Sequence, residues 1–138
     1  MENDVLLSKI DSLQRCIKRI EEKRPENPKI LIKDVDIQDI ISINLERAIQ
    51  ISVDIALHIV ADSNFESPKT MGESFAVLSD MKIIPKEIGE RLRKGVGFRN
   101  ISLHAYEKID WDIVFSIIHN HLDDFREFVK SIMKIVNK

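Results

Sequence analysis

The sequence predicts an all-α fold, an antiparallel bundle of about five helices, from three observations. Apolar residues recur at three- and four-residue spacing along most of the chain, which is typical of amphipathic helices. Neither strand-like alternation nor a Gly-rich phosphate loop is present. Short polar segments with proline separate the periodic stretches, which favours antiparallel neighbours. With 138 residues and 43% hydrophobic content, residues 1–138 are expected to form one helical domain.

The first helix is predicted over residues 4–23. Its apolar residues lie four, three, four and three positions apart and define one face: Leu6, Ile10, Leu13, Ile17 and Ile20. Cys16 lies beside this stripe and is expected to be a small core or boundary residue. The following segment, 24–33, contains two prolines and an asparagine and is predicted to be a loop.

The second helix is predicted over residues 37–62, with Asp36 as its N-cap. Because it is apolar on nearly every face, part of its surface is expected to be covered by a second copy of the chain. Its polar exceptions, Arg47, Asp54 and His58, share one face and could pair in the core or line an interface or a cleft. The i to i+4 spacing of Asp54 and His58 favours a structural pair over a catalytic one.

Two shorter helices are predicted next. Residues 63–70 form a loop, and Thr70 with Glu73 matches a capping box for a helix ending near Met81. Pro85 is suited to the first position of a fourth helix. One face of that helix carries Ile84, Ile88, Leu92 and Val96.

The last helix is predicted to begin after an N-cap at Asp110. An eight-residue seam with three- and four-residue spacing implies packing along its whole length and adds to the expectation of a dimer: Trp111, Val114, Ile118, His121, Phe125, Phe128, Ile132 and Ile135. His121 is expected to be a core residue with a hydrogen-bond partner. His119 and His121 point to different sides of a helix, so no metal site is predicted.

Composition narrows the classes of function. The net charge of −2 argues against a molecule that binds nucleic acid over its whole surface. One cysteine excludes an intramolecular disulfide, and the first residues lack the pattern of a signal peptide, so the chain is expected to be cytoplasmic. No apolar run is long enough to span a membrane. No cofactor is implied.

Residues 97–106 carry the polar groups that are most typical of a functional site. Arg99 can grip a phosphate, His104 can transfer a proton near neutral pH, and Tyr106 can orient either group or accept a modification. Gly95 and Gly97 make this stretch hard to continue as ordinary helix. The alternative is a helix-terminal loop in which the arginine and histidine cap carbonyl groups and the tyrosine packs.

A local excess of positive charge surrounds this stretch. Residues 82–108 contain seven Lys and Arg against three Glu. Such a run is commonly a solvated helix face, but Arg91, Arg93 and Lys94 precede Arg99 by one to two turns and could hold further phosphates of an RNA.

The sequence Arg-Asn-Ile-Ser-Leu-His-Ala-Tyr at residues 99–106 resembles the R-x4-H-x-Y motif of the HepT-like toxins of the HEPN superfamily. Similarity extends to residues 53–59 and to the closing helix at 112–114 and 121–125, so it covers nearly the full chain. Placed after a basic helix that starts with proline, in an all-α chain of this length, the motif is fairly specific.

The resemblance implies a dimeric, metal-independent ribonuclease that serves as the toxin of a toxin–antitoxin pair. Arg99 and His104 would be catalytic, and Asn100 and Tyr106 would support them. The partner would be a minimal nucleotidyltransferase antitoxin that adds AMP to Tyr106. Two-fold pairing would bring two motifs into one cleft.

Two other functions stay open at this point. The chain could be a non-catalytic helper that presents nucleotide or nucleic acid to a nucleotidyltransferase, with Arg99 and His104 holding phosphate only. It could also be a purely structural bundle, which would leave the motif without a purpose.

Overall fold

The computed structural model describes residues 3–137; Met1, Glu2 and Lys138 of the predicted 1–138 domain lie outside this range. Within it the chain is helical with no strand, as predicted, but it has seven α-helices rather than about five. The elements are α1 Asn3–Lys23, α2 Pro28–Lys33, α3 Val35–Ala61, α4 Met71–Asp80, α5 Lys86–His104, the 3-10 helix η1 Tyr106–Lys108, α6 Trp111–Asn120 and α7 Leu122–Val136.

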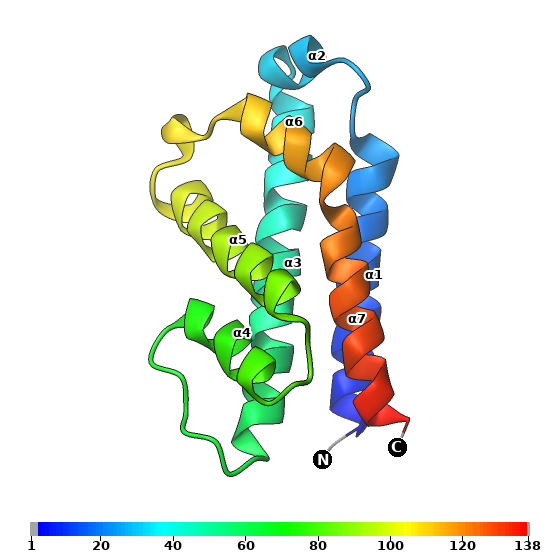
Figure 1. Cartoon of the computed structure of the whole chain (residues 1–138). Helices are drawn as coiled ribbons and strands as arrows, with labels where there is room; N and C mark the ends of the chain where they lie inside the picture. The colour runs from blue at the N-terminus through cyan, green and yellow to red at the C-terminus, as the bar shows by residue number, and fades with distance from the viewer. Residues whose placement is uncertain (1–2, 138) are drawn as a thin grey trace.

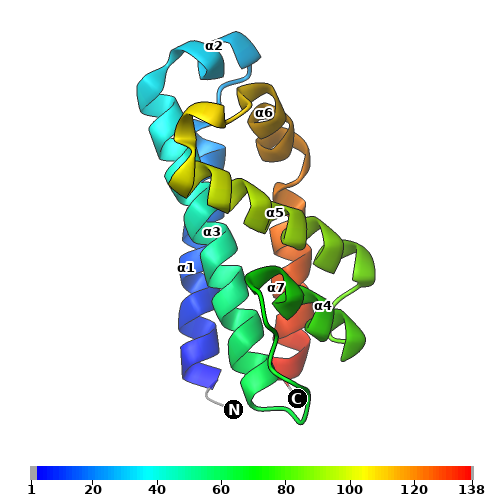
Figure 2. The same ribbon diagram turned by 90° about the vertical axis from the view of Figure 1, so that its left-hand side faces the viewer.

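Three long helices form the body of the molecule. Helices α1, α3 and α7 run roughly parallel to one axis, with α1 packed against both α3 and α7 (Figure 1). Helix α5 crosses this body obliquely, α4 packs against both α5 and α3, and α2 and α6 meet at one end (Figures 1 and 2). Because α5 ends at His104, its position across α3 and α7 determines where residues 97–104 lie.

The core is built from the predicted apolar faces. The stripe of α1 is buried, including Cys16, and burial raises the pKa of the Cys16 thiol, which fits an unreactive structural cysteine. Phe75 of α4 and Phe128 of α7 are fully buried and pack edge to face with ring centroids 5.9 Å apart. Such aromatic pairs add about 1 kcal/mol to the gain from burial.

The helix starts of α4 and α6 have the side-chain caps that the sequence predicts. Thr70 Oγ1 accepts the Glu73 N–H at 3.1 Å, and Asp110 Oδ1 accepts the Asp112 N–H at 3.0 Å. Helix α3 begins two residues earlier than predicted because Asp34, not Asp36, is its N-cap, and Pro85 is the N-cap residue of α5 rather than its first residue.

The loop predicted at 24–33 is wrong in its second half, which forms α2. Asn27 Oδ1 accepts the Lys29 N–H at 2.9 Å, and Pro28 occupies the first helical turn. Asparagine followed by proline marks a helix start as well as a turn, because the ring fixes φ and its missing N–H is not needed there. The Asn27-Pro28 pair predicts a loop in the sequence analysis, whereas in the structure it begins α2.

The prediction of a single closing helix is also wrong, because the helix is interrupted at His121, which separates α6 from α7. Asp123 and Asp124 in the first turn of α7 favour a new N-terminus at this point, since negative charge stabilises the exposed N–H groups. The rest of the seam packs as predicted, but His121 is 46% exposed rather than a core residue.

The predicted pair of Asp54 and His58 does not form. The Asp54 carboxylate accepts a hydrogen bond from Gln50 Nε2 at 2.9 Å. His58 Nε2 is buried with no hydrogen-bond partner among residues 3–137. Gln50 precedes Asp54 by four residues, the same spacing that separates Asp54 from His58. The Gln50 side-chain amide therefore makes the hydrogen bond to Asp54 that was predicted for the His58 imidazole.

Candidate active site

The R-x4-H-x-Y residues lie at the end of α5 and in η1. Helix α5 continues through Gly95 and Gly97 to His104, so the predicted interruption by these glycines is wrong. No glycine in the described chain has a positive φ. A Cβ on Gly95 would collide with the Ile49 side chain of α3, so this glycine allows α5 to pack closely on α3 and is not part of a turn.

Arg99 and His104 keep their functional groups available. Arg99 is half-buried, and its Nη1 donates to Asn100 Oδ1 at 3.1 Å. His104 is exposed, and its side chain makes no hydrogen bond or ion pair to any residue between 3 and 137. The alternative in which both side chains cap carbonyl groups of a helix end therefore does not apply.

Helix geometry separates the two groups. Five residues on an α-helix correspond to a rotation of about 140° and a rise of about 7.5 Å, so Arg99 and His104 do not point the same way. Asn100 and His104, four residues apart, share a face. One copy of the motif thus presents the Arg99 guanidinium and the His104 imidazole on different sides of α5.

Tyr106 is held from two directions. Its hydroxyl donates to Asp39 Oδ1 at 2.7 Å, and its ring packs edge to face on Trp111 with centroids 5.9 Å apart. Burial raises the pKa of the Tyr106 phenol; the Ser42 hydroxyl opposes the rise, and the hydrogen bond and charge of Asp39 add to it. The residue is still 37% exposed.

Asp39 belongs to a polar stripe on α3 that was absent from the sequence prediction. Asp39, Ser42 and Glu46 are spaced by three and four residues. Asp39 and Ser42 act on the Tyr106 hydroxyl, and Glu46 accepts a hydrogen bond from the Ser102 hydroxyl of α5. The signal was present, because this i, i+3, i+7 spacing of polar residues stands out on an apolar helix. Nothing local, however, connected it to residues 102–106.

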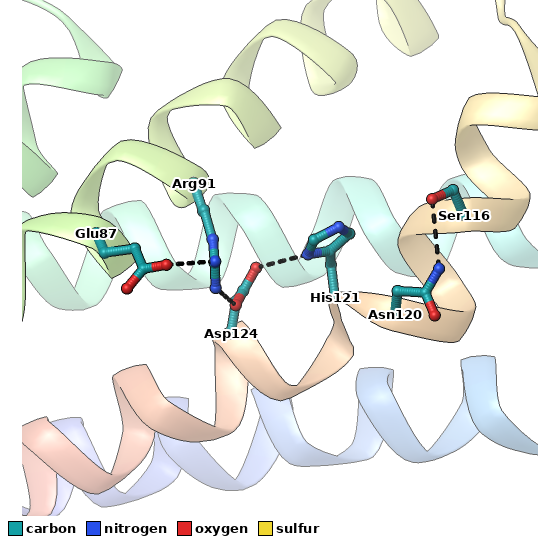
Figure 3. Close-up of polar contacts among 6 residues, drawn as sticks. All are labelled: Glu87, Arg91, Ser116, Asn120, His121 and Asp124. Carbon is teal, nitrogen blue, oxygen red and sulfur yellow. Dashed lines mark hydrogen bonds and ion pairs between the residues drawn. The ribbon is translucent and has the colours of Figure 1, made fainter.

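The three predicted phosphate-binding residues are not gathered around Arg99. Arg91 Nη1 lies 3.0 Å from Asp124 Oδ1, and its Nη2 is paired with Glu87 (Figure 3). Arg93 lies over Gly72 and lines a groove with Asn100, whereas Lys94 lines a separate pocket. Phosphate binding by Arg91 would have to compete with two carboxylates of the same molecule.

Asp124 connects this ion pair to the break before α7. Its carboxylate, in a residue 8% exposed, accepts from Arg91 on one side and lies 3.5 Å from His121 Nδ1 on the other (Figure 3). The cluster joins α5 to α7.

A pocket of about 700 Å³ lies beside the motif helix, between α3, α5, α6 and α7. Its wall is mostly apolar and includes Gly97, Phe98 and Ile101 of α5 together with Ile113 of α6. Ile101 and Ile113 are 44% and 58% exposed, and a Cβ on Gly97 would meet no atom within 4 Å. The surface next to the motif is thus open and apolar.

Neither a metal site nor a membrane span is found in the described chain. No group of three or more His, Cys, Asp or Glu side chains in residues 3–137 could hold a metal ion. No helix among these residues is long and apolar enough to cross a bilayer.

Comparison with known proteins places these features in one family. A model of the family described as Ribonuclease HepT-like matches residues 13–132. The mRNA nuclease HepT of Shewanella oneidensis is 34% identical over 127 residues, which cover 92% of this chain and 95% of the relative.

Two solved structures are similar over almost the whole chain. A tri-AMPylated HEPN toxin of Shewanella oneidensis in complex with its MNT antitoxin is 33% identical with a TM-score of 0.89, covering 95% of this chain and 98% of the toxin. A toxin–antitoxin complex with AMP-PNP is 32% identical with a TM-score of 0.90 and the same coverage. The chain therefore belongs to the HepT-like ribonuclease family.

Proposed function

We propose that this protein is a metal-independent endoribonuclease and the toxin of a toxin–antitoxin pair. The observation that carries the proposal is the free state of Arg99 and His104, which are exposed or half-buried at the end of α5 with no carboxylate partner in the described chain. The related mRNA nuclease supports RNA as the substrate.

The proposed chemistry needs three events. A base takes the proton of the ribose 2′-hydroxyl, a cation neutralises charge on the phosphate, and an acid protonates the leaving oxygen. His104 suits the proton transfers and Arg99 the phosphate, while Asn100 holds the Arg99 guanidinium through its side-chain oxygen.

A homodimer completes this site in the proposal. Since Arg99 and His104 of one copy point about 140° apart on α5, a cleft between two copies would let the arginine of one act with the histidine of the other. The exposed Ile101 and Ile113 line the same pocket as Gly97 and provide an apolar surface for such contact, and Leu103 of α5 is exposed as well.

Control is proposed to act through Tyr106. The related toxin is AMPylated and bound to an MNT antitoxin, so we propose a minimal nucleotidyltransferase as partner and Tyr106 as the residue that receives AMP. The added phosphodiester would attract Arg99 and repel incoming RNA, and the nucleotide would fill the cleft.

The test is RNA cleavage by purified protein in EDTA, with total RNA and tRNA as substrates and His104→Ala as the control. Cleavage by wild type alone is expected. If wild type binds RNA without cleaving it, the helper function, in which Arg99 and His104 only hold phosphate, replaces the nuclease.

A further inference from the structure

A carboxylate on α3 touches the atom that the proposed modification would use. Asp39 Oδ1 lies 2.7 Å from the Tyr106 hydroxyl although the two residues are 67 positions apart in the chain. Tyr106 is the only tyrosine of the protein. The contact therefore concerns a single, identifiable phenol.

The phenol is fixed but accessible. Asp39 lies in the second turn of α3, a helix of 27 residues, and Trp111 packs on the Tyr106 ring from α6. The tyrosine is nevertheless 37% exposed. The tyrosine is thus on the surface, and Asp39 sets the direction of its O–H bond.

A phenol in this position needs help to become a nucleophile. Its pKa is raised by burial and by the negative charges of Asp39 and Glu46, the charged groups of α3 that act on it, while the Ser42 hydroxyl opposes the rise. Very little phenolate exists near neutral pH, so the proton must be removed as the new bond forms. A carboxylate within hydrogen-bond distance of an attacking hydroxyl is the arrangement that protein kinases use for their substrate hydroxyl.

We propose that Asp39 of the toxin is a catalytic residue in the transfer of AMP to Tyr106 by the antitoxin. Asp39 orients the Tyr106 hydroxyl and accepts its proton while the oxygen attacks a nucleoside triphosphate held by the antitoxin. The inference rests on the proposed AMPylation of Tyr106. In the step, the Tyr106 oxygen forms a bond to the α-phosphorus, the bond from that phosphorus to the bridging oxygen breaks, and pyrophosphate leaves. The proton passes to Asp39 Oδ1 and then to solvent.

In the proposed reaction, each of the two proteins supplies different groups. The partner supplies the triphosphate and stabilises the pentavalent phosphorus, and the toxin supplies both nucleophile and base. An exposed tyrosine on another protein, without such a carboxylate, would be a poorer substrate, so Asp39 would also contribute to the choice of protein that is modified.

The test measures the rate of the first AMP addition by intact-protein mass spectrometry, with purified MNT partner, Mg²⁺ and ATP. Asp39→Asn keeps a side-chain oxygen that can accept the phenolic hydrogen but removes the base. We expect kcat to fall about 100-fold or more, within the usual range for loss of a general base, with KM for the toxin little changed. The rate of the variant should rise about tenfold per pH unit between pH 7 and 9 as hydroxide replaces the base, whereas wild type should depend less on pH.

Two controls exclude simpler explanations. Asp36→Asn removes an equal charge from an exposed position in the first turn of the same helix and should leave kcat unchanged. Tyr106→Phe should receive no AMP.

Ultraviolet titration of the single tyrosine measures the pKa of its phenol. This measurement separates a base, whose loss slows modification, from a charge that only raises the phenol pKa, whose loss would speed it. Removing the Asp39 charge should lower the pKa of the phenol. If Asp39 only restrained the tyrosine, Asp39→Asn would therefore be modified faster. An unchanged or increased kcat in Asp39→Asn overturns the inference while AMPylation of Tyr106 stands. Absence of any adduct on wild type overturns the proposed control by AMPylation and this inference with it.

Discussion

The two halves of α5 contain the same kinds of residue but use them differently. In the first half, Gly95 packs on Ile49 and Arg91 is held by Asp124 and Glu87. In the second half, Gly97 faces open space, and the Arg99 guanidinium donates a hydrogen bond to Asn100 and pairs with no carboxylate of residues 3–137. An arginine or a glycine in this helix thus stabilises the fold or remains available for binding, depending on whether another helix passes over it.

This difference separates stability from chemistry along one helix. The buried residues of α5 are concentrated in its first half, with Ser102 as the exception in the second. Substitutions before residue 97 should therefore act on folding, and substitutions from 97 onward should act on RNA cleavage or on association between copies.

The largest effect is expected for the motif side chains. Arg99→Ala and His104→Ala should each reduce RNA cleavage about 100-fold or more, because each removes a group proposed to act in the transition state. Both residues contribute little to the core, so the thermal midpoint should stay close to that of wild type. A large fall in the midpoint that accounts for the lost activity would contradict this division of α5.

The two glycines provide a matched pair for stability. Gly95→Ala should cost about 1–3 kcal/mol of unfolding free energy, since the new methyl group collides with Ile49 in a packed interface. Gly97→Ala should be neutral or stabilise by up to about 1 kcal/mol, since the methyl group enters open space and alanine favours helix. Urea unfolding of both variants measures the contrast, and equal losses would refute it.

The Arg91→Ala variant tests whether Arg91 stabilises the fold or binds phosphate. Arg91→Ala should lower the thermal midpoint, by less than Gly95→Ala does, because it leaves the mostly buried Asp124 carboxylate without its arginine. RNA affinity should change little, in contrast to Arg99→Ala. A loss of RNA affinity with unchanged stability would restore the predicted phosphate-binding role of Arg91.

The smallest effect concerns alkaline pH. The pKa of Tyr106 is raised in the folded protein, so the folded state holds the phenolic proton more tightly than the unfolded chain does. The resulting stabilisation is fully present below the unfolded pKa of about 10 and is lost as pH rises through the folded value. Tyr106→Phe should lose less stability than wild type over that interval, as measured by urea unfolding at matched pH values.

The sequence was most informative where structure depends on neighbours along the chain. The stripe of α1, the Thr70 cap and the Asp110 cap follow from spacing and from single hydrogen bonds, and all three form. Asn27 and Pro28 show the limit of such signals, because the same two residues suit a turn or a helix start.

The remaining features depend on contacts between distant segments. The packing of α5 through Gly95 needs Ile49 of α3, and the position of Tyr106 needs Asp39. Neither partner is specified by local periodicity, so the glycines were assigned to a helix interruption and Asp39 was not assigned to the site. The side chains of the R-x4-H-x-Y motif were identified from sequence, whereas their separation around α5 required the helix to be seen.

A site shared between two copies of the chain is proposed to close this separation of Arg99 and His104. Its most direct test is to coexpress Arg99→Ala and His104→Ala chains with different affinity tags, purify the mixed dimers through both tags, and measure RNA cleavage in EDTA. If the arginine of one copy acts with the histidine of the other, mixed dimers retain one intact pair and should cleave RNA well above the summed activity of the two separate variants. Mixed dimers that form but are no more active than either variant would contradict the shared site.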